Sequence, residues 1–458
     1  MKAKNPKISK ANSAYPKLNA NAAGIDIGAT SNYVAVPIDR AEEPVRRYGQ
    51  FTADLADIAD WLTECGVQTV AMESTSVYWV PLFELLETRG FKVCLINSRH
   101  WRTLDGRKTD VCDSQWLQYL HSCGLLHASY RPEQQVCSLR SLLRHREGLV
   151  QAASSQIQLM QKSLTQMNIQ LHNVISDLTG KTGLAILDAI LAGQRDPKVL
   201  AELKDPRIQC SKETIEKSLV GHYLPEHLFT LKQSLCSYRH FKTLIDDCDR
   251  EIEMMVANFD SRLDPTQMPP SSGSKQKPQG RNTIHFEHAN LTQEMHRIYG
   301  TDLTLVPGMG AQTVYTVFSE VGRDLSTPFH DDGRFSSWLG VCPGNNITGD
   351  KRKNSKTRKV ASRAAQAFRL AAQGLRRSQS ALGDYFRRMC ARLGTPKGIT
   401  ATAHRLARIF FHLVTTRETY NEAIFAEEQQ RSAKRRTNRV TKEAMRLGYR
   451  LVPIGAET

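Results

Sequence analysis

The chain has 458 residues, of which 40% are hydrophobic and 24% are charged, a balance typical of a globular protein with sizeable cores. This length exceeds what one hydrophobic core usually organises, so we expect two or three domains. The 62 Lys and Arg outnumber the 46 Asp and Glu, and the net charge of +16 favours nucleic acid over membrane as a partner, although solvated lysines are an equally common cause.

The cysteines and the apolar segments indicate neither export nor membrane insertion. The ten cysteines include no Cys-x-x-Cys pair, which argues against a zinc ribbon and a secreted disulfide framework and fits reduced thiols. The basic N-terminus lacks an apolar core, and no apolar run is long enough to span a bilayer. We therefore expect a cytoplasmic protein of bacterial type.

An α/β domain is predicted over residues 23–130, after a disordered basic arm at 1–22 that is rich in Lys, Asn and Ala. Three strands in hairpin succession are predicted from AGIDIG, SNYVAVPID and RYGQF, with the first turn at Gly28 to Ser31. The apolar spacing then predicts helix, strand, helix and strand over DLADIADWLTECG, VQTVAME, YWVPLFELLETRG and FKVCLIN. This order is typical of an RNase H-like sheet, and other α/β folds share parts of it.

A helical coiled-coil region is predicted over residues 131–262. Apolar residues recur there every seven positions, with a second set three positions later, which indicates about four heptads. The two sets are Val150, Ile157, Leu164, Leu171 and Leu178, and Ala153, Met160, Met167 and Val174. An intramolecular helical hairpin and a seam between subunits explain this pattern equally well.

The segment 263–283 is rich in Pro, Ser, Gly and Gln and contains no aromatic residue, so we predict a flexible linker. A mainly helical domain is expected over 284–426. A basic tail helix is expected over 427–458.

Four acidic residues form a candidate metal site in the first domain. Asp26 lies within an apolar strand, where a carboxylate requires an ion or a partner, and Glu73 ends another strand at the edge where open α/β sheets place ligands. Asp110 and Asp113 share one face at a predicted helix start, although acids there also simply complement the helix dipole. Two-metal phosphodiester cleavage uses three or four such carboxylates. We therefore predict that all four bind magnesium or manganese and are catalytic.

The DIGAT turn that follows Asp26 also resembles the phosphate-binding turn of actin-like and sugar-kinase ATPases. Those enzymes need a second Gly-rich phosphate loop and an adenosine loop. Neither is found further along this chain in a suitable strand and loop context.

Several motifs, in the same order, closely resemble transposases of the IS-one-ten (IS110) family of insertion sequences, particularly its IS-eleven-eleven group. The early motifs are GIDIG, VAMESTSVYW and INSRHWRTLDGRKTDVCDSQWLQYL, and the late ones are LVPGMG, FSSWLGVCPGNNITGDKRKNSKTRK and RAAQAFRLAAQGL. The middle helices LTGKTGLAILDAILAGQRDP and VGHYLPEHLFTLKQSL extend the resemblance over nearly the whole chain.

The resemblance implies a RuvC-like DEDD domain whose acids match Asp26, Glu73, Asp110 and Asp113, followed by a C-terminal transposase domain. It also implies a serine nucleophile that forms a covalent phosphoserine link to DNA, a structured bridge RNA that selects targets, and assembly into dimers or tetramers. The implied function is a DNA transposase or recombinase. A RuvC-like structure-specific endonuclease and a catalytically impaired nucleic-acid-binding relative are alternatives.

The chain departs from the family at the nucleophile. Relatives usually have Ile-Ser-Gly-Gly after the CPGN turn, whereas this chain has Ile347, Thr348, Gly349 and Asp350. Threonine retains a hydroxyl, but its methyl group adds bulk and restricts χ1. We assign Thr348 to the nucleophile position.

The segment from Lys351 to Arg363, directly after the Thr348 turn, contains no acid and seven basic residues: Lys351, Arg352, Lys353, Lys356, Arg358, Lys359 and Arg363. Such a run is usually a solvated surface, but its position beside the candidate nucleophile favours contact with phosphates. The earlier turn LVPGMG fits a helix-hairpin-helix turn that approaches phosphate, and also a plain Pro-Gly turn. For Tyr78, Trp79 and Trp101, core packing is favoured over stacking on a base.

Overall fold

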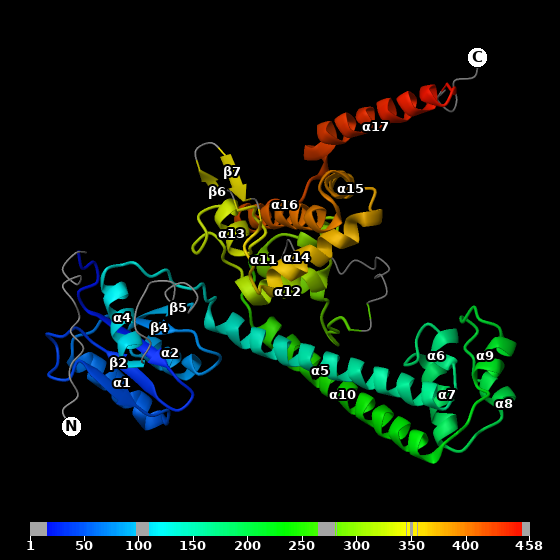
Figure 1. Ribbon diagram of the computed structural model, residues 1–458, viewed down its shortest axis with the longest axis horizontal. Helices are drawn as coiled ribbons and strands as arrows, with labels where there is room; N and C mark the ends of the chain where they lie inside the picture. The colour runs from blue at the N-terminus through cyan, green and yellow to red at the C-terminus, as the bar shows by residue number, and fades with distance from the viewer. Residues whose placement is uncertain are drawn as a thin grey trace. The chain divides into compact units, whose positions relative to one another are not determined.

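The computed structural model describes residues 16–97, 110–263, 280, 282–344, 346–348, 351–354 and 356–450, and the side chains of these except at 110–112, 346–348, 351–354, 426–429, 431–433 and 436 (Figure 1). The chain divides into two compact units, Met1–Arg131 and Pro132–Thr458. None of the described helices is both long and apolar enough to cross a membrane.

The first unit contains a mixed sheet of five strands in the order β3-β2-β1-β4-β5. The strands are β1 (Ala22–Ile27), β2 (Asn32–Ala35), β3 (Val45–Tyr48), β4 (Thr69–Glu73) and β5 (Lys92–Ile96). β2 is antiparallel to β1 and β3, whereas β4 is parallel to β1 and β5. The N–H of Gly28 donates to the carbonyl of Ser31 and closes the first turn. Strands are found at four of the five predicted places, and the third, predicted over RYGQF, instead covers Val45–Tyr48, because Phe51 already caps the helix that begins at Thr52.

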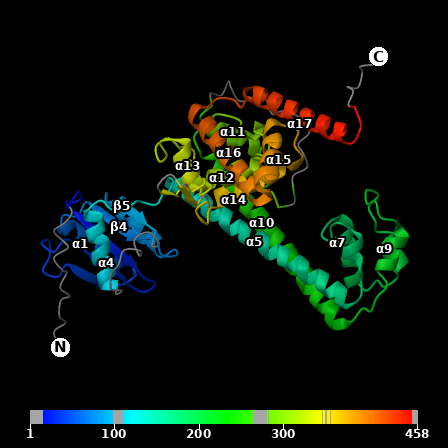
Figure 2. The same ribbon diagram turned by 45° about the horizontal axis from the view of Figure 1, so that its top comes forward.

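Helices cover both faces of this sheet (Figure 2). Ala23, Ile25 and Ile27 alternate along β1 and pack with α1 (Thr52–Glu64) and α2 (Trp79–Thr88). The opposite face packs on α4 (Asp110–Ser122), where Ala71 of β4 meets apolar residues of the helix. Because side chains alternate along a strand, Gly24 and Asp26 share the α4 face.

The described end of the predicted basic arm, 1–22, is ordered. The N–H of Asn19 donates to the carbonyl of Ser122 at 2.9 Å, and its side-chain amide donates to the carbonyl of His121 at 2.8 Å. Ala22 is fully buried as the first residue of β1. These bonds tie the segment to the end of α4, so a disordered arm reaching to residue 22 is wrong. Residues 1–15 lie outside the described residues.

A long helical hairpin begins the second unit. α5 (Gln134–Gln166) packs along α10 (Pro225–Ala257), and the four short helices between them lie at its tip (Figure 1). These are α6 (Leu171–Val174), α7 (Lys181–Leu191), α8 (Pro197–Ala201) and α9 (Lys212–Ser218). Met160 and Leu164 of α5 belong to one buried cluster with Leu231 and Leu235 of α10. The hairpin interpretation of the apolar repeat therefore holds for α5.

The predicted seam of four heptads is not continuous. α5 ends at Gln166, and Asn168 has a positive φ of 55° that turns the chain back. Leu171 and Leu178 lie beyond this turn and are buried in the tip of the hairpin. The seven-residue repeat therefore spans two separate packing environments.

The rest of the second unit is a mainly helical body, as predicted. It contains α11 (Leu291–Tyr299), η3 (Leu303–Leu305), α12 (Ala311–Val321), α13 (Asp332–Trp338), β6 (Asn346–Thr348), β7 (Lys351–Asn354), α14 (Arg363–Gly374), η4 (Leu375–Arg377), α15 (Ala381–Leu393), α16 (Thr395–Thr416), η5 (Glu422–Phe425) and α17 (Ala426–Arg446). Its core is aromatic, with edge-on contacts among Tyr299, Phe318, Phe368 and Phe410. Residues 264–279 and 281 of the predicted linker lie outside the described residues.

A buried ion pair joins the hairpin to the segment that enters this helical body. Arg146 of α5 and Asp249 of α10 are each 4% exposed, and one guanidinium N–H donates to the carboxylate at 3.0 Å. Arg146 also donates to the carbonyls of Asn282 and Thr283, and Asp249 accepts from the N–H of His285 at 3.2 Å. Both charges are thus satisfied by hydrogen bonds, as burial requires.

We predict that Arg146→Met lowers the free energy of unfolding by about 3–5 kcal/mol, because it leaves Asp249 buried without its partner. The double variant Arg146→Met/Asp249→Leu should lose less than Arg146→Met alone, since no uncompensated charge remains. Urea unfolding of the full chain measures both. Equal stability of Arg146→Met and the parent would contradict the assignment.

Candidate catalytic site in the N-terminal unit

Asp26 and Glu73 lie side by side at the carboxyl edge of the sheet. The parallel pairing of β1 and β4 sets Gly24 opposite Ala71 and Ile25 opposite Met72. The same register, continued by one residue, sets Asp26 opposite Glu73. Residues at one level of adjacent strands point to the same face. This is the face that packs on α4. Asp26 is half-buried and Glu73 is 2% exposed.

Gly24 determines how closely α4 approaches this face. A Cβ at Gly24 would lie 2.4 Å from the carbonyl oxygen of Ser114 and 2.3 Å from the backbone nitrogen of Gln118. Only glycine accommodates so short a separation between strand and helix. α4 therefore lies directly on β1, two residues before Asp26.

The direction of α4 brings its first turn to the acidic edge. The side chain of Gln118 donates to the carbonyl of Ala22, so the later part of α4 lies at the start of β1. The earlier part, with Asp110 and Asp113, consequently extends toward the end of β1. Asp113 is half-buried, and the side chain of Asp110 lies outside the described side chains.

The far end of α4 is fixed by His121. Its Nε2 lies 2.8 Å from the hydroxyl of Thr69 at the start of β4. Burial lowers the pKa of His121, and the positive charge of Lys92 lowers it further, so the neutral ring is favoured. Together with the bonds from Asn19, this contact fixes the helix against the strands that carry the acids.

Thr75 is a functional candidate that the sequence reasoning missed. Its hydroxyl donates to Oε1 of Glu73 at 3.2 Å and so orients the carboxylate. The neighbouring Ser76 has a positive φ of 50°, and the indole N–H of Trp79 donates to its carbonyl at 3.0 Å. The hydroxyl residues that directly follow VAME in the sequence could have indicated Thr75, because ligands of open α/β sheets bind at the carboxyl ends of strands.

Of the aromatic residues predicted to pack in the core, Trp79 does so and Tyr78 does not. Trp79 packs edge-on against Phe83 beside the main core of the sheet, whereas Tyr78 is 42% exposed. Trp101 lies outside the described residues.

No group of three or more His, Cys, Asp or Glu that suits a metal ion is found among the described side chains, which do not include that of Asp110. The predicted four-acid ligand set is therefore a proposal. What the described backbone provides is one edge at which two acidic strand ends and the start of α4 come together.

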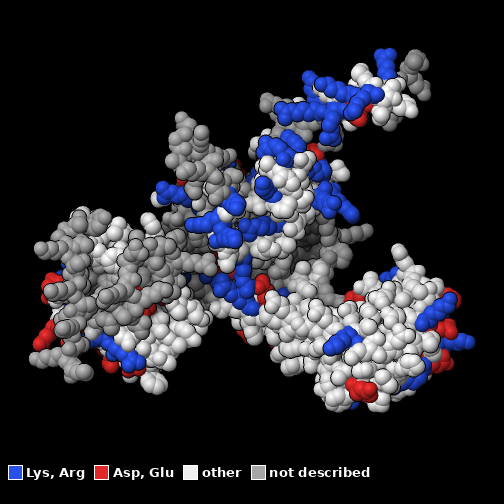
Figure 3. All heavy atoms as spheres, viewed as in Figure 1, with Lys and Arg blue, Asp and Glu red and all other residues white. Residues whose placement is uncertain are grey.

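Four of the C-terminal candidate residues, Thr348 and the three basic residues that follow at 351–353, lie on the small β-hairpin of β6 and β7. Thr348 of β6 pairs with Lys351 of β7, and the side chains of both strands, Arg352 and Lys353 included, lie outside the described side chains. Lys356 and Lys359 are exposed, and the guanidinium of Arg358 donates to the carbonyl of Ser337 at 3.0 Å. Lys and Arg also gather over the exposed surface of this helical body (Figure 3).

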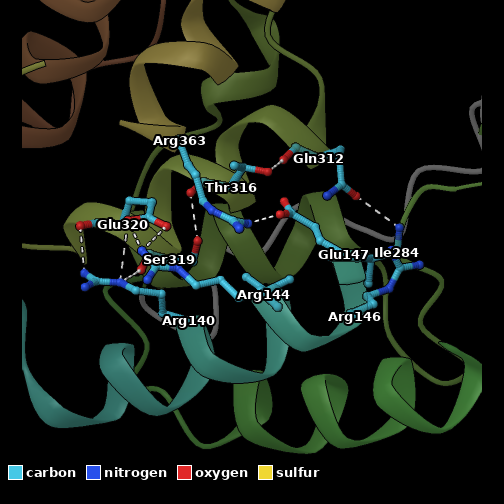
Figure 4. Close-up of a pocket in the computed structure, with 11 residues that line it drawn as sticks. Arg140, Arg144, Arg146, Glu147, Ile284, Gln312, Thr316, Ser319, Glu320 and Arg363 are labelled. Carbon is cyan, nitrogen blue, oxygen red and sulfur yellow. Dashed lines mark hydrogen bonds and ion pairs between the residues drawn. The ribbon is translucent and has the colours of Figure 1, made fainter. Parts of the chain in front are cut away.

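Arg363 has a partner within the chain. Its guanidinium pairs with the carboxylate of Glu147 on α5, in a pocket where Arg144 also binds Glu320 (Figure 4). Burial lowers the pKa of Arg363, and the charge of Arg144 lowers it further. The structure therefore gives Arg363 a role in joining α14 to α5.

The turn at Gly308 is explained by packing. Gly308 has a φ of 89°, and a Cβ there would lie 2.8 Å from the carbonyl oxygen of Ala371 in α14. The glycine is thus required by a close approach within the protein, which favours the plain-turn interpretation of LVPGMG.

Gly24→Ala should lower the free energy of unfolding by about 1–3 kcal/mol, because the new methyl group forces α4 away from β1. Gly148→Ala is the matched control, since nothing lies within 4 Å of a Cβ there and alanine favours helix α5 by about 1 kcal/mol. Thermal unfolding of the two variants measures the difference. A neutral Gly24→Ala would show that α4 does not lie directly on the strand.

Two family models match the chain. One, a transposase model for the DEDD domain of IS110, matches residues 23–169, and the other, described as the transposase IS116/IS110/IS902 family, matches residues 301–387. A search of curated proteins found no match. The DEDD transposase domain implies an RNase H-like fold, with which the mixed sheet and its covering helices agree. Such families are DNA-cutting and DNA-recombining enzymes that bind DNA. The chain belongs to the IS110 family of transposases.

Proposed function

We propose that this transposase cuts and exchanges DNA strands with a metal site formed by Asp26, Glu73, Asp110 and Asp113 and with the hydroxyl of Thr348. The observation that carries the proposal is the β1–β4 register, which sets Asp26 beside Glu73 under the helix that bears the other two acids.

The residues at this edge fit a divalent metal ion. Carboxylate oxygens are the ligands that magnesium and manganese prefer, and this set offers four carboxylates from three segments. A metal ion bound there would stabilise the negative charge that develops on phosphate oxygens during cleavage. The fit rests on the chemistry of the donors and on their common edge.

The surrounding residues of the chain prepare this edge for binding. Asp26 is held by a strand that pairs on both sides, and Glu73 is oriented by the hydroxyl of Thr75. Rigid positioning of acidic groups lowers the reorganisation needed when substrate binds. Glu73 is almost fully buried, so bulk water has little access to its carboxylate.

For the C-terminal half of the chemistry, we propose that Thr348 occupies the nucleophile position. Attack of its oxygen on a DNA phosphorus would form a phosphothreonine bond, displace the 3′ or 5′ oxygen of the broken strand, and pass the hydroxyl proton to a base. Lys351, Arg352, Lys353, Lys356, Arg358 and Lys359 would neutralise the backbone phosphates nearby, and Arg363 would contribute once released from Glu147.

Partners beyond DNA follow from the family resemblance. A structured bridge RNA would select the target, and dimers or tetramers would bring several sites together. The positive surface of the helical body is compatible with both nucleic acids (Figure 3). An enzyme with these partners would act at the bacterial nucleoid.

Two other functions use only part of these features. A RuvC-like endonuclease would need the four acids and water but not Thr348. A catalytically impaired relative would bind nucleic acid without cutting, in keeping with threonine in place of the family's serine.

Asp26→Asn should reduce excision of a mini-element from a plasmid by at least about 100-fold, because even outer-shell changes at metal sites cost about 10- to 100-fold. DNA binding measured by fluorescence anisotropy should be retained. Asp57→Asn, an exposed acid on α1 at the other face of the sheet, is the matched control and should excise normally. Full excision by Asp26→Asn would exclude the proposed metal site.

Thr348→Ala should abolish a covalent protein–DNA adduct trapped with a nicked suicide substrate, whereas Thr348→Ser should retain or increase it, since serine lacks the restricting methyl group. Denaturing electrophoresis of labelled DNA measures the adduct. Cleavage by Thr348→Ala without any adduct would favour the endonuclease. Absence of both cleavage and adduct in the parent protein would favour the impaired relative.

A further inference from the structure

The C-terminal helix α17 presents a straight row of positive charges. Arg435, Arg439, Lys442 and Arg446 are spaced four, three and four residues apart, so they lie on one face of the helix. All four side chains are exposed. At a rise of 1.5 Å per residue, the row is about 17 Å long. We call these four residues the α17 stripe.

The charge around the stripe is almost uniform. Residues 430–450 contain one acid, Glu443, and eight basic residues, namely Arg431, Lys434, Arg435, Arg436, Arg439, Lys442, Arg446 and Arg450. Figure 3 shows Lys and Arg side chains along the described part of this helix. One carboxylate cannot neutralise eight basic side chains, so this surface is strongly positive and favours a polyanion as its partner.

The base of α17 is anchored to the helical body. The guanidinium of Arg405 on α16 lies between two rings, 4.4 Å from the centroid of Tyr385 and 4.7 Å from that of Phe425, the residue before α17 begins. Glu422 accepts from the N–H of Ala381 at the start of α15, at 2.6 Å. Cation–π contacts of this kind stabilise a fixed geometry. The stripe is thus attached to the body that contains Thr348.

The chemistry of the stripe distinguishes among polyanions. Within α17 the sequence contains no aromatic residue, so the helix offers no platform for stacking on unpaired bases. A line of Arg and Lys without aromatics is suited to phosphates, which position a protein on a duplex without reading its sequence. Val440 and Ala444 lie on the opposite side of the helix, so no apolar residue interrupts the basic row.

We propose that the α17 stripe binds the phosphate backbone of double-stranded DNA, independently of base sequence. Over about 17 Å of its axis, duplex DNA carries roughly ten phosphate charges, so all four side chains have a phosphate within reach. The stripe shares no residue with the acidic set or with the segment 351–363. It extends the DNA-binding surface to a part of the chain that neither family model covers.

The test compares two full-length variants by fluorescence anisotropy with a random-sequence duplex, over a range of salt concentrations. One variant replaces the stripe, as Arg435→Gln, Arg439→Gln, Lys442→Gln and Arg446→Gln. The control replaces four exposed lysines at the tip of the hairpin, as Lys181→Gln, Lys198→Gln, Lys217→Gln and Lys232→Gln, with the same change of net charge. Glutamine retains helix propensity, and circular dichroism checks that both variants fold.

Each lost phosphate contact reduces the slope of log K against log salt by about 0.9, so the stripe variant should flatten that slope by about 3 to 4. The control should keep the slope of the parent. An unchanged slope in the stripe variant, or an equal loss in the control, would overturn the proposal. A loss seen with a structured RNA and not with the duplex would overturn it in favour of RNA. Because binding is measured without cleavage, the result is independent of the metal site.

Discussion

The absence of a side chain at Gly24 is the constraint on which the candidate site depends. Helix α4 lies so close to β1 that a methyl group would overlap its backbone at Ser114 and Gln118. With the helix seated there, its antiparallel direction brings Asp110 and Asp113 toward the strand ends that carry Asp26 and Glu73. Two acidic strand ends and the start of α4, far apart in sequence, thereby come to one edge, and metal-assisted phosphodiester chemistry of the proposed kind requires acids gathered in this way.

The second unit is organised by a different interaction, the buried pair of Arg146 and Asp249. Both residues use their remaining hydrogen-bonding capacity on the backbone of 282–285, so the hairpin holds the start of the helical body through main-chain contacts. Glu253, one helical turn later on α10, accepts from the N–H groups of Glu287, His288 and Ala289 in the same way. These backbone contacts, together with the ion pair of Glu147 and Arg363, join the hairpin to the body that carries Thr348.

The strands and helices of the first unit could be predicted from the sequence because the apolar spacing and the turn residues, such as Gly28 after the first strand, indicate the same boundaries. Asp26 could be singled out because it is an acid within an apolar strand. Whether the acidic residues come close to one another depends on the β1–β4 register and on the close approach of α4 at Gly24. Neither can be read from the spacing of apolar residues. The seven-residue repeat failed beyond Met167, because the left-handed Asn168 turns the chain while apolar residues continue into another core. Arg363 and Gly308 have packing partners distant in sequence, Glu147 and Ala371, that local pattern cannot indicate.

The proposed metal centre would be held by three segments of the first unit. Ferrous iron substituted for magnesium, followed by ascorbate and peroxide, cleaves a protein backbone next to the bound ion, and mass spectrometry maps the cuts. A shared centre should give cuts in three segments together, at the end of β1 near Asp26, at the end of β4 near Glu73 and at the start of α4, all suppressed by excess magnesium. Cuts in one of these segments alone, or only elsewhere in the chain, would rule out a metal centre shared by the three segments.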